Sequence, residues 1–92
     1  MSKARASHIL VDNEATCKSI KEEIEKGADF AEMAKKHSTC PSGRSGGELG
    51  EFSPGEMVKE FDTVVFSKEV GKVHGPVKTQ FGYHLILITQ RN

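Results

Sequence analysis

The chain of 92 residues is long enough for one domain with a modest hydrophobic core and too short for two. Charged residues make up 28% of the chain and hydrophobic residues 36%, and the 13 basic side chains are balanced by 13 acidic ones. Such a composition is typical of a soluble protein and gives no general attraction to nucleic acid or acidic lipid. We therefore interpret residues 1–92 as a single domain that is a monomer and binds no nucleic acid.

No segment has the length and hydrophobicity of a membrane span or a signal peptide. The longest apolar run, residues 85–88, is far shorter than the roughly 20 residues that cross a bilayer. Residues 1–8 contain no apolar stretch of signal-peptide length, so we expect a cytoplasmic protein that does not insert into membranes. Cys17 and Cys40 could pair, but without an export signal two cysteines are more typical of reduced thiols.

The chain begins with a predicted strand and a predicted helix. Residues 4–11 become apolar before a polar turn, and alternation along this strand places His8 on the same face as two alanines. In the segment that follows, Ala15, Ile20 and Ile24 lie near helical spacing among Lys and Glu residues, as in an amphipathic helix. That helix should end at the Lys-Gly pair that comes next.

A second helix is predicted to begin at Asp29, which forms a capping-box-like pair with Glu32 three residues later. Pro41 disfavours helical geometry just before it, so the helix should end near residues 38–39. One face of this helix carries apolar and aromatic side chains at helical spacing. These are Phe30, Met33, Ala34 and His37.

The middle of the chain, residues 40–55, is rich in glycine, proline and serine. This composition favours a structured loop, with a short strand at residues 49–52. A third short helix is predicted after the loop, because four apolar residues recur at positions i, i+4, i+7 and i+8. They are Met57, Phe61, Val64 and Val65.

Two final strands are predicted around residues 76–78 and 83–89, joined as a hairpin across residues 80–82. His84 lies in the last strand, in which both alternating sets of positions are largely apolar. That strand should therefore be central in its sheet. Composition and periodicity together predict a small α+β domain.

Four histidines and two cysteines could supply metal ligands or a nucleophile with its base. His37 and Cys40 are spaced like two metal ligands, but no second closely spaced pair accompanies them, so we predict no metal and no other cofactor. The glycine-rich segment 43–47 lacks the Lys-Ser/Thr ending of a phosphate-binding loop. Cys40 with a histidine could form a nucleophile and its base, although a cysteine beside a loop is more often a small packed side chain. Taken alone, His8 and His84 fit half-exposed residues of a sheet.

Short motifs follow one another at specific spacings over nearly the whole chain. They are ASHILV at residues 6–11, ADF at 28–30, HSTC at 37–40, GGELGEF at 46–52, GPVKT at 75–79 and FGYHLI at 81–86, with Met57 and Phe61 in between. Each could arise by chance, but their order and spacing together are highly specific. With them the sequence resembles the parvulin family of peptidyl-prolyl cis/trans isomerases, and most closely the minimal single-domain parvulins of prokaryotes.

The resemblance implies a fold and a catalytic set. The fold would be a four-stranded antiparallel sheet flanked by helices, with His8 and His84 on neighbouring central strands beneath the active site. Cys40 and Thr79 would lie around the rotating bond, held with the histidines in one hydrogen-bonded arrangement. In this interpretation the two histidines act mainly through structure, and not as general acid and base.

The resemblance also implies a binding pocket for proline. Leu49, Met57 and Phe61 would enclose the proline ring of Pro-containing peptides and of unfolded or folding proteins, with Phe81 beside the rotating bond. Rotation cleaves no bond, so the expected reaction is non-covalent. Phosphate-selective parvulins carry a long basic loop after the first strand, whereas residues 11–14 here are short and acidic, so we expect no dependence on phosphate.

Two other classes of function fit the same residues. A chaperone-like module could hold Pro-containing segments in an identical groove without isomerising them. A thiol hydrolase would need a reactive Cys40 and an oxyanion hole, which the sequence does not locate. An isomerase assay separates the first alternative, and labelling of Cys40 with iodoacetamide at neutral pH separates the second.

Overall fold

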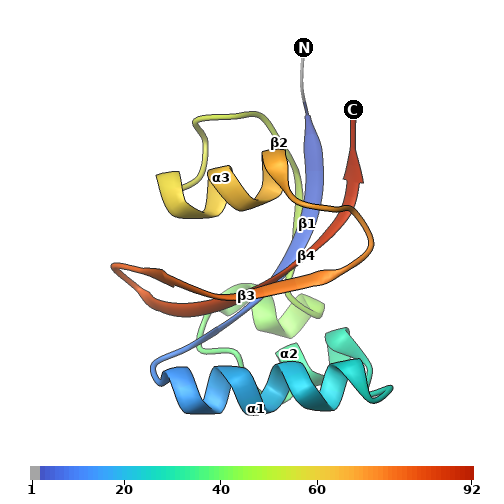
Figure 1. The fold of residues 1–92 in the computed structure, drawn as a ribbon, viewed down its shortest axis with the longest axis vertical. Coiled ribbons are helices and arrows are strands. Elements are labelled where there is room, and N and C mark those ends of the chain that lie inside the picture. The colour runs from blue at the N-terminus through green and yellow to red at the C-terminus, as the bar shows by residue number, and fades with distance from the viewer. Residues whose placement is uncertain (1–2) are drawn as a thin grey trace.

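A computed structural model describes residues 3–92 as a four-stranded antiparallel sheet with helices on both faces (Figure 1). The strands lie in the order β2-β1-β4-β3, so β1 and β4 are central. Their bounds are β1 (Ala4–Val11), β2 (Glu48–Phe52), β3 (Val73–Thr79) and β4 (Gly82–Arg91). The predicted α+β class, antiparallel sheet and central last strand are confirmed.

Three helices and one short 3-10 helix connect these strands. They are α1 (Glu14–Glu25), α2 (Phe30–His37), the 3-10 helix η1 (Pro41–Ser45) and α3 (Lys59–Ser67). Figure 1 shows α1 and α2 on one side of the sheet and α3 on the other. Asn13 caps α1 by accepting from the Thr16 N–H, and Asp29 caps α2 by accepting from the Glu32 N–H. Within residues 3–92, no helix has the length and apolar character needed to span a membrane.

The alternation of side chains along β1 and β4 creates two hydrophobic cores, one on each face of the sheet. Ile9 and Leu85 point into the core beneath α1 and α2, together with Ile20. Ala6 and Ile86 point into the core beneath α3. A sheet covered on both faces needs apolar residues at nearly every position of its central strands, which explains the lack of polar alternation in β4.

The apolar faces of α1 and α3 differ from the predicted ones. On α1 the buried residues are Cys17 and Ile20, whereas Ala15 is exposed. The face thus follows a cysteine, which behaves as a small apolar side chain when buried. The predicted third helix was wrong at its start, because Met57 lies in a turn before Lys59, the first residue of α3.

Strand β3 is longer than predicted. It begins at Val73, three residues before the predicted start at residue 76. The register of β3 on β4 shifts between His74 and Val77, so the Gly75-Pro76 pair forms a bulge inside the strand. Bulges place proline in a sheet without the loss of a regular ladder hydrogen bond.

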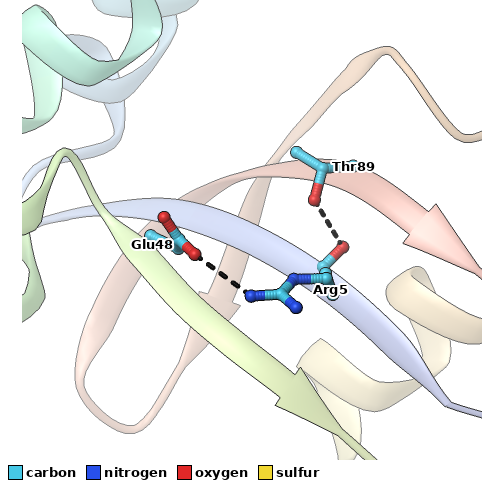
Figure 2. Close-up of polar contacts among 3 residues, drawn as sticks. All are labelled: Arg5, Glu48 and Thr89. Carbon is cyan, nitrogen blue, oxygen red and sulfur yellow. Dashed lines mark hydrogen bonds and ion pairs between the residues drawn. The ribbon is translucent and has the colours of Figure 1, made fainter.

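The end of the sheet far from the β3–β4 hairpin is tied by side chains across three strands. Between Arg5 and Ala6 the register of β1 on β4 shifts by one residue, which leaves Thr89 as a bulge. The Thr89 hydroxyl donates to the Arg5 carbonyl oxygen at 3.1 Å, and the Arg5 guanidinium donates to Glu48 Oε1 on β2 at 3.4 Å (Figure 2). The central strands are therefore fixed at this end, away from the site described next.

Candidate active site

Two buried histidines meet on the α3 face of the two central strands. His8 lies on β1 and His84 on β4, where His84 pairs with Leu10 two residues beyond His8. Their Nδ1 atoms are 3.0 Å apart, and the rings stack with centroids 5.2 Å apart and an interplanar angle of 21°. His8 is 6% exposed and His84 4% exposed. Two buried imidazoles in such contact must share a proton, because one nitrogen has to donate and the other accept.

The hydrogen bonds continue from His8 into η1. His8 Nε2 lies 3.1 Å from Ser42 Oγ, and the Ser42 hydroxyl donates to Cys40 Sγ at 3.3 Å. The loop approaches β1 closely at this point, since the His8 N–H donates to the Gly47 carbonyl oxygen at 2.9 Å. A Cβ atom on Gly47 would lie 2.3 Å from the His8 carbonyl oxygen, so only glycine fits there.

On the other side, hydrogen bonds run from His84 to the β3–β4 hairpin. His84 Nε2 lies 2.7 Å from Thr79 Oγ1, and the Phe81 N–H donates to the same oxygen at 3.1 Å. A backbone N–H can only donate, so it fixes the direction of the chain of hydrogen bonds at this end.

One assignment of protons satisfies every side chain in this series of hydrogen bonds. Thr79 accepts from Phe81 and donates to His84 Nε2. His84 then carries its proton on Nδ1 and donates to His8 Nδ1. His8 carries its proton on Nε2 and donates to Ser42, whose hydroxyl donates to Cys40. Both imidazoles are neutral in this assignment, which is inferred from the hydrogen-bond geometry.

The electrostatic environment also favours neutral imidazoles. Burial, and then the neighbouring His84, lower the pKa of His8 from its ordinary value to about 4. Burial lowers the pKa of His84 too, against an opposing effect of the Glu60 carboxylate. At neutral pH neither ring is therefore positively charged.

A mostly apolar cavity of about 370 Å³ opens above the two histidines. Its aliphatic and aromatic walls come from β2, the turn before α3, α3 and the β3–β4 hairpin. Phe61 lines it, with its ring edge-on to His8 and His84 at centroid distances of 5.7 and 5.9 Å. Phe81 stands at its mouth, 60% exposed. The lining residues are His8, Leu10, Thr39, Cys40, Pro41, Leu49, Met57, Val58, Phe61, Phe81 and His84.

The structure brings all eight sequence-predicted site residues together. Seven of them line the cavity, and Thr79 reaches it through its hydrogen bond to His84. Ser42 was missed, although it links His8 to Cys40. A hydroxyl two residues after Cys40 in a tight turn is the only sequence signal that could have pointed to it. Residues 3–92 contain no group of three or more His, Cys, Asp or Glu side chains that could hold a metal ion.

The sequence also matches a known protein family. A family model described as rotamase, PPIC-type PPIASE domain, matches residues 5–90. The chain belongs to this family. The resemblance to parvulins and the predicted isomerase function of the domain are thereby confirmed.

The relatives include both long and short proteins. The foldase protein PrsA of Geobacillus kaustophilus is 50% identical over 90 residues, which is 97% of this chain and 32% of the relative. A crystal structure titled as the peptidylprolyl isomerase PrsA of Bacillus anthracis superposes with a TM-score of 0.96 at 39% identity, over 99% of this chain and 42% of that one. NmPin, a parvulin of Nitrosopumilus maritimus, superposes with a TM-score of 0.88 at 37% identity and covers 98% of both chains. The chain spans about a third of the length of the PrsA relatives that it matches.

Proposed function

We propose that this domain catalyses rotation about X-Pro bonds without a covalent step and without requiring phosphorylated Ser or Thr before the proline. The observation that carries the proposal is the apolar cavity of about 370 Å³ lined by two buried histidines that hydrogen-bond each other. Such a cavity suits a proline ring, and the neutral chain of hydrogen bonds gives it fixed walls. His8, Cys40, Thr79 and His84 form the proposed catalytic set.

The cavity acts on the amide by favouring its twisted state. A planar X-Pro amide is separated from its isomer by a barrier of roughly 18–20 kcal/mol, and the twisted amide at the top is less dipolar than the planar one. Leu49, Met57 and Phe61 bind the ring and exclude water, which favours the less dipolar state. Shortening a reaction of tens of seconds to milliseconds takes about four decades, or on the order of 5–6 kcal/mol.

The hydrogen bonds of Cys40 argue against a thiol hydrolase. A cysteine nucleophile is activated by a base in direct contact with the sulfur. Here Cys40 Sγ accepts from Ser42, and His8 Nε2 bonds to the Ser42 hydroxyl instead of the sulfur. The arrangement holds the thiol in place beside the cavity and does not activate it.

A protease-coupled isomerase assay tests the proposal. Matched peptides with Leu-Pro, Ser-Pro and phospho-Ser-Pro should show turnover of the first two and no advantage for the third. The short acidic segment 11–14 supports that expectation, because a dianion needs clustered basic side chains. Peptide binding without acceleration would assign the chain to a holding module. A preference for phospho-Ser-Pro would refute the independence from phosphate.

The proposal also covers the substrates, the cellular compartment and the oligomeric state. The name foldase of the PrsA relatives supports unfolded or folding proteins as substrates of the whole protein. Cys17 and Cys40 are both free, which supports a reducing compartment such as the cytoplasm. Action as a monomer is part of the same proposal, and sedimentation of the purified chain tests it.

A further inference from the structure

A second cavity, of about 490 Å³, adjoins the apolar cavity above the two histidines, which is called the proline cavity below. The two cavities differ in chemical character. The two cavities share residues 39–41, which include Cys40. The two cavities are therefore neighbours on either side of this segment. Its remaining walls come from α2 and η1 and include Lys35, Ser38 and Arg44. The isomerisation described above uses none of these three side chains.

The charge of the second cavity is positive. Among residues 3–92, Arg44 has no acidic partner within 4.0 Å. Lys35 Nζ lies 3.8 Å from Glu32 Oε1, but both side chains are largely exposed, and such a pair contributes little. No acidic residue lines the cavity. The two cations are thus available to an anionic group.

Ser38 adds a third donor. Its hydroxyl oxygen accepts from the Leu10 N–H at 3.1 Å and from the Cys40 N–H at 3.3 Å. A serine hydroxyl has one hydrogen besides its two lone pairs, and both lone pairs are used here. The hydrogen of Ser38 is left to donate to a group inside the cavity.

The second cavity is held in shape by the contact between η1 and α2. A Cβ atom on the buried Gly43 would lie 2.9 Å from the Ala34 carbonyl oxygen and 3.0 Å from Ser38 Cβ. Only a residue without a side chain permits this approach, which brings Arg44 to the same cavity as Lys35. A preformed site loses less free energy to ordering when a ligand binds.

We propose that the second cavity, here called the basic subsite (Lys35, Ser38 and Arg44), binds a carboxylate side chain of the substrate. Residues 39–41 line both cavities, and an extended peptide advances roughly 3.3 Å per residue, so one or two residues of a substrate span a single stretch of backbone. The carboxylate therefore belongs to a residue about two positions from the isomerised proline. This inference rests on the proposed isomerase function and adds a preference for acidic sequences near the proline.

A peptide series tests the basic subsite. Each peptide contains one Ala-Pro bond, with either Glu or Gln at a single position from three residues before to three residues after the proline. At one position about two residues from the proline, kcat/KM should be roughly two- to fivefold higher for Glu, as expected for exposed charge pairs. Arg44→Gln and Lys35→Gln should bring this ratio toward 1. Lys36→Gln is the matched control, because it removes the same charge from an exposed position of α2 outside the cavity.

Several outcomes overturn the assignment. A Glu/Gln ratio near 1 at every position does so, and so does a ratio that survives the combined Arg44→Gln and Lys35→Gln changes. A ratio that Lys36→Gln lowers as much as Arg44→Gln does would reflect overall charge, and not the subsite. The Gln peptides test the proposed isomerase function separately, since their turnover needs no carboxylate. If no Gln peptide is turned over, the affinities of Glu and Gln peptides decide the subsite by the same ratio.

Discussion

The two faces of the sheet are filled in different ways. The face toward α1 and α2 is closed, with Ile9 and Leu85 fully buried against Ile20 in a cluster of apolar side chains. The face toward α3 has an apolar core only around Phe61 and its neighbours, and beside it lies the cavity above the histidine pair. One sheet therefore separates a face that stabilises the fold from a face that holds the site.

This separation depends on alternation along β4. His84 and Ile86 point toward α3, and Leu85 between them points toward α1 and α2. A shift of the strand by one residue would exchange the two sets and bury His84 in the closed core without partners. The closed core thus fixes the register on which the site depends.

The largest expected effect comes from Phe61, which belongs to both the α3 core and the cavity. It is 3% exposed and its ring contacts both histidines. Phe61→Ala should lower the free energy of unfolding by about 3–5 kcal/mol and should also lower kcat/KM in the molecules that stay folded. Urea unfolding and the isomerase assay measure the two effects.

Val65→Ala is the matched control for Phe61→Ala. Val65 is fully buried on the same helix but does not line the cavity. It should lose stability while kcat/KM of the folded protein stays near that of the wild type. An unchanged kcat/KM in Phe61→Ala would place the proline site elsewhere.

The second prediction concerns the closed face. Ile20 on α1 is 2% exposed and lies on the opposite side of the sheet from the cavity. Ile20→Ala should lower the free energy of unfolding by about 3 kcal/mol and leave kcat/KM unchanged below the melting transition. A loss of kcat/KM without unfolding would show that the two faces are coupled through the strands. It would contradict the separation of a stabilising face from a face that holds the site.

The third prediction concerns protonation of His8, on the face of the sheet toward α3. The pKa of His8 is lowered to about 4, whereas an unfolded histidine takes up its proton near pH 6.5. Between these values the unfolded chain binds a proton that the folded chain does not. The free energy of unfolding should therefore fall as the pH decreases from about 6.5 to about 4, by on the order of 2–3 kcal/mol. Urea unfolding at several pH values measures this, and His8→Gln should show a smaller dependence.

Measurements on His8 and His84 also distinguish a structural role of these histidines from a direct chemical role. If His8 and His84 act through structure, His84→Ala should lower both the melting temperature and the rate. The kcat/KM of the wild type should begin to change only at a pH below the ordinary histidine pKa of about 6.5, because burial lowers the pKa of both rings. A wild-type melting temperature with complete loss of activity in His84→Ala would favour a direct chemical role.

The sequence allowed the sheet faces, the Asp29 cap and the residues around the cavity to be predicted, for identifiable reasons. The Asp29 cap forms a local contact, and alternation in β4 depends only on the strand itself. The position of Met57 was wrong because a spacing of four residues also fits a turn followed by a helix. That turn is fixed by Asp62, whose Oδ2 accepts from the Gly55 N–H at 2.8 Å, and tertiary contacts of this kind leave no periodic pattern.

Cys17 and Ser42 show two further limits of sequence reasoning. Cys17 is fully buried on α1, and burial raises the pKa of its thiol to about 11. Its role as a core residue was missed because Cys17 was considered only for a possible disulfide. Ser42 was missed because a hydroxyl in a loop has no repeat to reveal its partner. Only the folded loop brings it to His8.

A smaller effect is expected at Ser42, whose hydroxyl joins the two parts of the hydrogen-bonded chain. Ser42→Ala leaves His8 Nε2 without its partner and should lower the free energy of unfolding by about 1 kcal/mol. Thr89→Ala is a suitable control, since that hydroxyl donates to the Arg5 carbonyl oxygen and Thr89 does not line the cavity. A reduction in kcat/KM for Ser42→Ala alone would show that the orientation of His8 matters for the rate.

The smallest effect is expected for Cys40→Ser, because the reaction forms no covalent intermediate. Serine can accept the Ser42 hydrogen bond that Cys40 Sγ accepts, and it is slightly smaller than cysteine. The variant should keep its stability within about 1 kcal/mol and retain measurable, though weakened, isomerase activity. A covalent nucleophile would instead lose nearly all activity when sulfur is replaced by oxygen. Mass spectrometry of the wild type incubated with a Pro-containing peptide provides the second measurement, and a trapped Cys40 adduct would contradict the non-covalent mechanism.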